Sequence, residues 1–526
     1  MTSAGATVAI GEDLDGVDPV SYHRRWLILA TMCLSLVLIV ATVSSVNVAI
    51  PSLSGSELRP SDTQVLWIVD SYALVFAALL LPAGALGDRF GRKGALLIGL
   101  VIFAVASAVS AFMTSANALI GCRAVMGIGA ALIMPSTLSL LQSCFPRRER
   151  AKAIAMWAGF AGAGGAIGPV LGGVLLAHFW YGSVFFVAVP IALVAFIASA
   201  VLAPSSREAD AARIDIRGAL LSIVGFAALL VAIIEGPELG WSAPLVVAGF
   251  AASVICLAGF VALERRITDP LLDMRFFRNR RFAMGSMGIS VSFFAMFSMF
   301  FVLTQYLQYV AGYSALGAGL RGLPFAATMI IVSPRAPLIA QRLGAKRAVA
   351  GGMFVMAIGV FLMSLVGRDT SYYYVAVCLV LTAAGIGAAM PSLSSGIVQS
   401  VPMNKAGVGA AVNDTTREVG GAIGIAIVGS IVNSIFRSNV GSALAQLPAE
   451  QQEIARHNIA KALGVSRGIA ESGDPVAAGE LQRAVQQAFL DGAHVALKVS
   501  AALVVVAAIV MYRRLPDSGE HSAPSH

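Results

Sequence analysis

Four polar residues near position 415 interrupt a long apolar stretch and could together bind and release protons. Asn413, Asp414, Arg417 and Glu418 all lie within the apolar run 407–431. In a helix, Asn413 and Arg417 share one face, and Asp414 and Glu418 are four residues apart on the neighbouring face. One arginine cannot neutralise two carboxylates, so at least one of the two is expected to carry a proton. The alternative for Asp414 is a position near the cytoplasmic end of the helix, where water solvates it.

Two further charged residues lie inside other apolar runs. Asp70 falls in the run 66–86, beside Trp67 and Tyr72, and Arg123 falls in a later one. An ionisable group at membrane depth costs at least ~2.5 kcal/mol, so it is a candidate for function. Asp70 could bind a proton or a cation, and Arg123 could hold a carboxylate until that carboxylate is protonated. The alternatives are an Asp70 hydrated at the membrane interface and an Arg123 in a fixed structural ion pair.

The composition indicates a membrane protein. The chain has 526 residues, of which 58% are hydrophobic and only 12% are charged, whereas about a quarter of the residues in a soluble domain are charged. The net charge of +8 could suggest a nucleic-acid partner. The basic residues, however, lie in short loops between apolar runs, which is the pattern of membrane topology. We therefore predict no nucleic-acid partner.

The sequence carries no motif for metal, cofactor or nucleotide chemistry. Five cysteines are scattered without pairing or metal-ligand spacing. The glycine-rich stretches lack the Gly-Lys-Ser/Thr of an ATP-binding loop, and neither a zinc spacing nor a nucleophile elbow is present. We predict that the protein is not an enzyme, has no catalytic residues or metal site and needs no cofactor.

The apolar runs predict an all-α protein with fourteen transmembrane helices. A span needs about 20 apolar residues, and the runs that qualify are approximately 26–47, 66–86, 95–113, 116–136, 151–175, 183–203, 217–234, 243–262, 282–304, 318–338, 348–366, 371–392, 407–431 and 493–511. Lys and Arg are concentrated in every second connection, which places both termini in the cytoplasm. We predict a multi-pass protein of the plasma (inner) membrane with cytoplasmic tails at 1–25 and 512–526.

Two repeated motifs indicate an internal duplication. Gly-Ile-Gly-Ala-Ala occurs at 127–131 and at 385–389, and Gly-Gly-Ala-Ile-Gly occurs at 164–168 and at 420–424. The separations are 385 − 127 = 258 and 420 − 164 = 256 residues. Parallel repeats of six spans are typical of carriers that bind substrate between the halves. The predicted parts are an N-terminal bundle at 26–203, two inserted helices with their linker at 204–264, and a C-terminal bundle at 265–511. The C-terminal bundle includes a long outside segment at 438–488, which is predicted to be a solvated loop.

A stripe of small residues marks the fifth span. Gly164, Gly168 and Gly172 are four residues apart, and Pro169 and Gly173 lie beside them. Water would destabilise such a helix. In hydrocarbon the backbone must stay hydrogen-bonded, so the helix persists and the bare stripe lets a neighbouring helix approach closely.

Several motifs together resemble the major facilitator superfamily, specifically its fourteen-span drug:proton antiporter branch. The resemblance covers nearly the whole chain and rests on six segments, which are 46–51, 67–72, 84–93, Arg123 to Gly129, 164–173 and 264–271. It implies a monomer that uses the proton gradient to export hydrophobic, often cationic, small molecules by alternating access. The expected partners are such a substrate, protons and membrane lipid.

The same resemblance suggests roles for individual residues. The segment after the second span is expected to gate the carrier through Gly84, Asp88, Arg89, Gly91, Arg92 and Lys93. Asp88 can meet a helix N-terminus or a basic residue of the other half in one state only. One departure concerns Thr42, which stands where the family usually has an aspartate. The number of protons exchanged per substrate is therefore left open.

A substrate cavity is predicted from aromatic and amide side chains. The candidates are Asn47, Trp67, Tyr72, Phe297, Phe301, Tyr306 and Asn413. Phenylalanine that faces lipid or packs in the core is the alternative for span nine. Two alternative functions also stay open: export of a lipid or cell-envelope precursor, and a non-transporting membrane sensor or scaffold.

Overall fold

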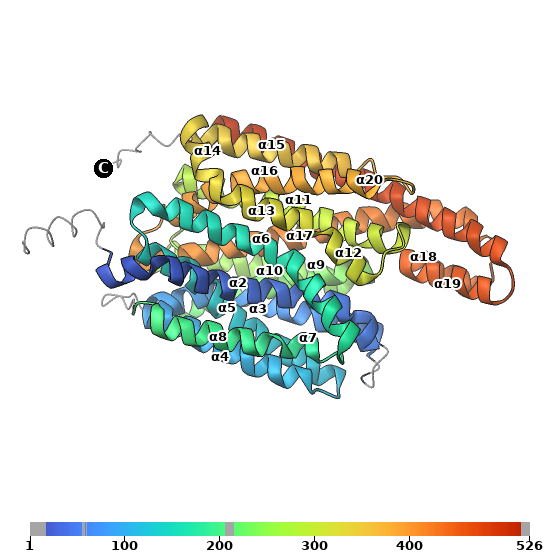
Figure 1. The fold of residues 1–526 in the computed structure, drawn as a ribbon, viewed down its shortest axis with the longest axis horizontal. Coiled ribbons are helices and arrows are strands. Elements are labelled where there is room, and N and C mark those ends of the chain that lie inside the picture. Colours follow the sequence, from blue (N-terminus) through green and yellow to red (C-terminus); the bar gives the residue numbers. More distant parts are fainter. Residues whose placement is uncertain (1–16, 55–57, 59, 206–214, 446, 517–526) are drawn as a thin grey trace, which may run out of the picture.

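Fourteen helices long and apolar enough to cross a membrane run through the part of the chain that the structure describes. The computed structural model describes residues 17–54, 58, 60–205, 215–445 and 447–516. Helix α2 begins and α20 ends at the same end of the bundle (Figure 1). We call this the basic end, because Arg92, Arg147 and Arg513 lie there, and we call the opposite end the far end. The predicted all-α class and fourteen spans are confirmed.

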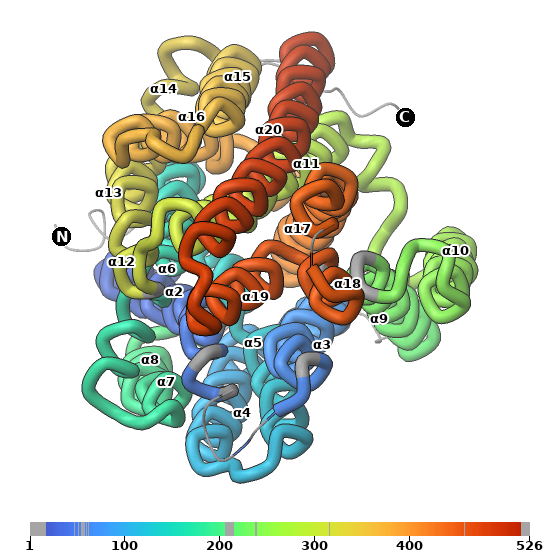
Figure 2. Tube along the Cα trace, turned by 90° about the vertical axis from the view of Figure 1, so that its right-hand side faces the viewer, coloured from blue at the N-terminus to red at the C-terminus, as the bar shows by residue number. Residues whose placement is uncertain are grey.

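The first six spans form one bundle of seven helices. Span six is broken, and α7 and α8 together make it. In Figure 2 these helices occupy the lower part of the molecule. Their bounds are α2 (Pro19–Ser54), α3 (Asp62–Phe90), α4 (Arg92–Ala111), α5 (Ala116–Cys144), α6 (Arg147–His178), α7 (Ser183–Phe186) and α8 (Ala188–Leu202).

Two inserted helices lie on one flank of the molecule. Helix α9 (Ile216–Leu239) packs on α3 and α17, whereas α10 (Pro244–Glu264) packs principally on α9 and lies at the periphery (Figure 2). The Trp241 side chain at their far-end turn donates a hydrogen bond from Nε1 to Ser430 Oγ, at 3.0 Å. This bond ties the inserted pair to the second half.

The last six spans form the second bundle. Span ten is broken at Ser333–Arg335, a short 3-10 turn at Pro334, as a proline inside a helix requires. The bounds are α11 (Arg280–Gln305), α12 (Ala315–Arg321), α13 (Leu323–Val332), α14 (Ala336–Leu343), α15 (Ala345–Met363), α16 (Tyr372–Val398), α17 (Ala406–Leu444) and α20 (Pro475–Arg514). Short helical turns cover Met274–Arg278, Tyr306–Val310 and Met403–Lys405.

The segment 438–488 is helical, which corrects the expectation of a solvated loop. Helix α17 continues to Leu444, α18 (Ala449–His457) and α19 (Ile459–Glu471) follow, and α20 already begins at Pro475. These helices extend beyond the other spans at the far end (Figure 1). The reason lies in α19, where Ile459, Ala462, Leu463 and Ser466 recur at helical spacing and are buried.

The glycine stripes pack the same way in both halves. A Cβ on Gly168 of α6 would lie 2.3 Å from the Ala41 carbonyl oxygen of α2, and a Cβ on Gly424 of α17 would lie 2.4 Å from the Phe294 carbonyl oxygen of α11. Span five therefore packs on span one as span thirteen packs on span nine. This equivalence supports the duplication read from the repeated motif.

The Gly-Ile-Gly-Ala-Ala motif has the same two glycines in both halves, but corresponding glycines face different neighbouring helices. Gly127 of α5 lies against α3 and Gly129 lies against α4. In the second half, Gly385 lies against α15, the counterpart of α4, and Gly387 lies against α13. Residues two apart project to nearly opposite sides of a helix. The sequence match thus identifies the right helix but aligns the wrong glycine.

Substituting Gly168 is expected to disrupt the fit between α6 and α2. A Cβ there would lie 2.0 Å from Ser44 Oγ as well as 2.3 Å from the Ala41 carbonyl oxygen, and overpacking of this kind costs about 1–3 kcal/mol or more. Gly168→Ala should lower the melting temperature of the purified protein. Gly165→Ala is the matched control, because a Cβ at Gly165 meets nothing within 4 Å. Equal melting temperatures for the two variants would contradict the close packing.

Candidate functional site

The polar cluster of α17 is buried among helices from both halves. Asn413 and Asp414 are 0% exposed and Arg417 is 2% exposed, while Glu418 is half-buried. Asn413 Nδ2 donates to Asp414 Oδ1 at 3.0 Å, and Arg417 Nη1 lies 3.9 Å from the same oxygen. This burial agrees with the expectation that Asp414 is a charged group at membrane depth. It does not agree with the alternative, in which bulk water solvates Asp414.

Arg417 is held between aromatic rings of the two halves. Its guanidinium carbon lies 4.7 Å from the Trp157 ring centroid on α6 and 5.3 Å from the Phe293 ring centroid on α11. The Trp157 indole is itself fixed by a hydrogen bond from Nε1 to Thr137 Oγ1, at 3.1 Å. Because cation–π contacts strengthen when water is excluded, both halves contribute to the position of this charge.

A second polar cluster joins α3 and α5. Arg123 is fully buried, its Nε donates to the Ile68 carbonyl oxygen at 2.9 Å, and its guanidinium carbon lies 4.6 Å from the Tyr72 ring centroid. Arg123 also interacts electrostatically with Asp70, which is partly buried on α3. The structure thus brings Asp70, Tyr72 and Arg123 together.

Tyr72 connects the two clusters. Its hydroxyl lies within electrostatic range of both Arg123 and Glu418. Several polar atoms of the clusters have no hydrogen-bond partner among the described residues, namely Tyr72 Oη, Arg123 Nη1 and Nη2, Asn413 Oδ1, Asp414 Oδ2, and Arg417 Nε and Nη2. Buried polar groups are normally paired.

Glu235 is a site residue that the sequence reasoning missed. It lies on α9, partly buried, and interacts electrostatically with Asp70. The predicted apolar run of this span ends at residue 234, so the carboxylate lies just outside it. A signal was present, because an acidic residue directly follows five apolar ones at 230–234. The inserted helices therefore contribute a carboxylate to the Asp70 cluster.

The basic ends of α3 and α17 are locked together by Asp88. Its Oδ1 accepts the Gly407 N–H at 2.9 Å and its Oδ2 accepts the Val408 N–H at 3.1 Å, at the N-terminus of α17. Arg92 Nε lies 3.1 Å from Asp88 Oδ1, and Arg92 also donates to the Met403 carbonyl. A Cβ on Gly84 would lie 2.5 Å from the Gly407 carbonyl oxygen. Of the predicted gating residues, Gly84, Asp88 and Arg92 make the contact between the halves.

The remaining residues of the predicted gate lie around that contact. Gly91 has a φ of 107° and allows the sharp break between α3 and α4. Lys93 donates from Nζ to the Ala200 carbonyl at 2.7 Å and so braces its own half. Arg89 is half-buried at the last turn of α3, with its guanidinium carbon 5.6 Å from the Phe90 ring centroid.

A profile of known sequences decides the family. The Major Facilitator Superfamily profile matches residues 32–425. The chain belongs to the Major Facilitator Superfamily. The multidrug efflux pump LfrA of Mycolicibacterium smegmatis is 35% identical over 489 residues, which cover 93% of this facilitator and 96% of LfrA. The methyl viologen resistance protein SmvA of Salmonella typhimurium is 31% identical over 494 residues, with coverages of 93% and 98%.

Solved structures agree with the facilitator fold. The human organic anion transporter MFSD10 (TETRAN) superposes with a TM-score of 0.60 at 14% identity, over 94% of this chain and 100% of that one. The proton:xylose symporter XylE superposes with a TM-score of 0.58 at 14% identity, over 94% of this chain and 96% of that one. At such identities the likeness shows the fold alone.

The predicted cavity residues of this facilitator occupy different places. Tyr72 and Asn413 belong to the two clusters, and Trp67 is half-buried one turn before Asp70. Phe297 and Phe301 pack on α17, where a Cβ on Gly421 would lie 3.0 Å from the first ring and one on Gly429 would lie 3.5 Å from the second.

Tyr306 and Thr42 each donate a hydrogen bond to a carbonyl of their own half. Tyr306 is buried, with its hydroxyl donating to the Gly367 carbonyl at 3.0 Å. Thr42 is buried as well and donates to the Leu38 carbonyl within its own helix, at 2.7 Å. The Asn47 side chain lies outside the described part of the facilitator.

Proposed function

We propose that this facilitator exports hydrophobic, often cationic, small molecules across the plasma membrane in exchange for protons. The observation that carries the proposal is the buried cluster of Asp414, Arg417 and Glu418, which lies where helices of both halves meet. The names of LfrA and SmvA, a multidrug efflux pump and a methyl viologen resistance protein, support the substrate class. Both termini are proposed to lie in the cytoplasm.

The exchange follows from competition for the same carboxylates. A protonated Glu418 or Asp70 cannot attract a cationic substrate, and a bound cation disfavours protonation. Substrate and proton therefore lower each other's affinity, and this reciprocal effect is sufficient for antiport. Arg417 and Arg123 stabilise the charged forms of the carboxylates beside them, so each protonation also releases an arginine for a new partner.

The Asp88 contact serves as the gate at the basic end. The contact exists only while the N-terminus of α17 lies against α3, so it favours the state in which this end is closed. Opening must exchange the two backbone hydrogen bonds and the Arg92 pair for water. A cation entering from the cytoplasm then meets Asp414 and Glu418 about two to three helical turns above the gate.

Glu235 is proposed to tune the charge preference of the carrier. Removing one carboxylate from the Asp70 cluster should weaken the site by about 1 kcal/mol per unit of substrate charge. Glu235→Gln is therefore expected to lower the apparent affinity about fivefold for a monocation and about thirty-fold for a dication, and to leave a neutral substrate unchanged. Competition for transport in vesicles measures all three. Glu480→Gln, an exposed site on α20, is the control, and equal losses for all three substrates would contradict the role.

Purified protein in sealed vesicles tests the function as a whole. An imposed pH gradient should drive a cationic dye across the membrane, and collapsing the gradient should stop it. If the gradient instead moves a labelled lipid but no dye, the protein exports a lipid or envelope precursor. If neither moves while a substrate still binds, the protein is a sensor or scaffold.

A further inference from the structure

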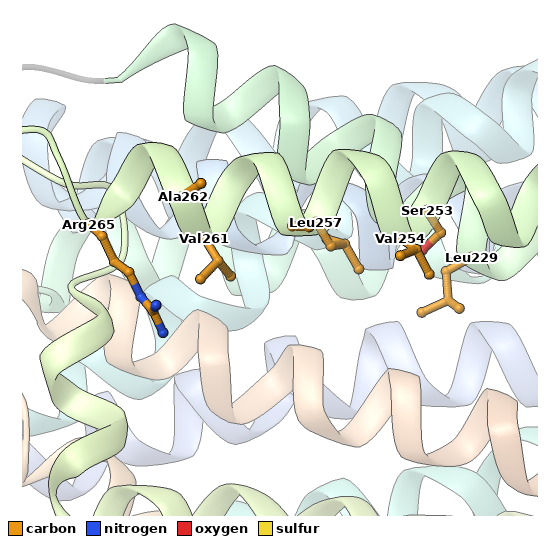
Figure 3. A pocket seen from close by; sticks show the side chains of 8 residues that line it. Leu229, Ser253, Val254, Leu257, Val261, Ala262 and Arg265 are labelled. Carbon is orange, nitrogen blue, oxygen red and sulfur yellow. The ribbon is translucent and has the colours of Figure 1, made fainter.

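An apolar groove of about 600 Å³ lies along α10 (Figure 3). Its lining includes Leu229 of α9, and Leu257, Ala258 and Val261 of α10. Helix α10 packs principally on α9, and the groove lies along the junction of these two helices. The groove is shallow and open, so a molecule bound in it would remain exposed along one side.

Among the residues that the structure describes, Arg265 is the one charged residue that lines the groove. It follows the last residue of α10 at the basic end, and in Figure 3 its side chain projects from the helix toward the same side as Leu257 and Val261. Within the described ranges, no carboxylate forms an ion pair with it. A lone cation at one end of an apolar groove attracts an amphiphile with an anionic head and repels the cationic substrates proposed above.

The groove has the length of one membrane leaflet. Twelve residues separate Ser253 from Arg265, which is about 18 Å along a helix at 1.5 Å per residue. Half the hydrocarbon thickness of a bilayer is about 15 Å. A lipid whose phosphate lies at Arg265 would therefore extend a chain past Val261 and Leu257 to Ser253, near the middle of the membrane.

We propose that this groove binds an anionic phospholipid from the leaflet at the basic end. Arg265 pairs with the phosphate, and one acyl chain lies along α10. Anionic lipids in the cytoplasmic leaflet attract basic residues at the membrane surface, and an apolar groove adds a fixed place for the chain. The lipid would fill the space beside the inserted pair, so this pair would sense the composition of the membrane.

Native mass spectrometry of the whole protein tests the site. The protein is released from vesicles of phosphatidylglycerol and phosphatidylcholine with identical acyl chains, and the retained lipids are counted. We expect one phosphatidylglycerol to be retained about fivefold more often than phosphatidylcholine. Arg265→Gln should abolish this preference and Arg265→Lys should keep it. Arg266→Gln is the control, because Arg266 does not line the groove.

Filling the groove separates a lipid site from a plain anion site. Ala258→Phe should displace the retained phosphatidylglycerol with Arg265 intact, whereas Ile255→Phe, at an exposed residue of α10 outside the groove, should not. The proposal is overturned if phosphatidylcholine is retained equally well. It is also overturned if inorganic phosphate alone displaces the lipid or if Ala258→Phe has no effect. These readouts do not depend on transport.

Discussion

Glu418→Gln is expected to prevent a pH gradient from driving substrate accumulation. Glutamine keeps the shape of the side chain but cannot exchange a proton, so the competition between proton and cation is lost. Because couplings between two ligands are typically about 1–3 kcal/mol, gradient-driven accumulation should fall about 5- to 150-fold. Downhill exchange of substrate should persist. Accumulation of a dye in vesicles under an imposed gradient measures the effect.

Proton release on substrate binding tests more directly whether Glu418 exchanges a proton for substrate. In the unmodified protein, adding substrate to a detergent solution in weak buffer should release protons, and Glu418→Gln should release fewer. Glu480→Gln controls for loss of an acidic residue elsewhere, since Glu480 is exposed on α20. If Glu418→Gln released as many protons and accumulated as much substrate as the unmodified protein, Glu418 would not be the coupling residue. Asp70 or Asp414 would then have that role.

Asp88→Ala is expected to open the contact at the basic end. The change removes the acceptor of two backbone N–H groups and leaves Arg92, which is 2% exposed, without its carboxylate. Breaking a buried pair in this way costs about 3–5 kcal/mol, so the population of the closed state relative to the open one should fall about 150- to 5,000-fold. Alkylation of Val408→Cys by a membrane-impermeant reagent measures the opening, because Val408 is 3% exposed behind Asp88.

Glu149 offers a matched control for Asp88. Its carboxylate pairs with Arg25 Nε at 2.7 Å at the same end, but the two residues belong to one half and are partly exposed. Such a pair is worth about 0–1 kcal/mol, so Glu149→Gln should leave Val408→Cys unreactive. Asp88→Asn should give intermediate reactivity, because the amide retains one acceptor oxygen. An unreactive cysteine in folded Asp88→Ala would show that this contact is not the gate.

The fourteen spans and the six-span repeat could be predicted from the sequence alone. Each span must satisfy its own backbone hydrogen bonds in hydrocarbon, so a local run of about 20 apolar residues is decisive. The glycine stripe of α6 was equally local, because residues four apart share a face whatever the helix packs against. The polar cluster at 413–418 could be found for the same reason, since charge inside an apolar run is costly wherever the run lies.

Contacts between distant helices were decided only by the tertiary structure. Glu235 lies near the Asp70 cluster because α9 packs on α3. Trp157 of α6 contacts Arg417 of α17 across the two halves. Contacts between helices also decided which neighbour Gly385 and Gly387 each face. The same is true of the packing of α19. A sequence pattern fixes which face of a helix is apolar or charged. The packing of the whole bundle decides what that face contacts. Lipid and the protein interior are nearly equally apolar, so the sequence pattern does not distinguish a face on lipid from a face on another helix.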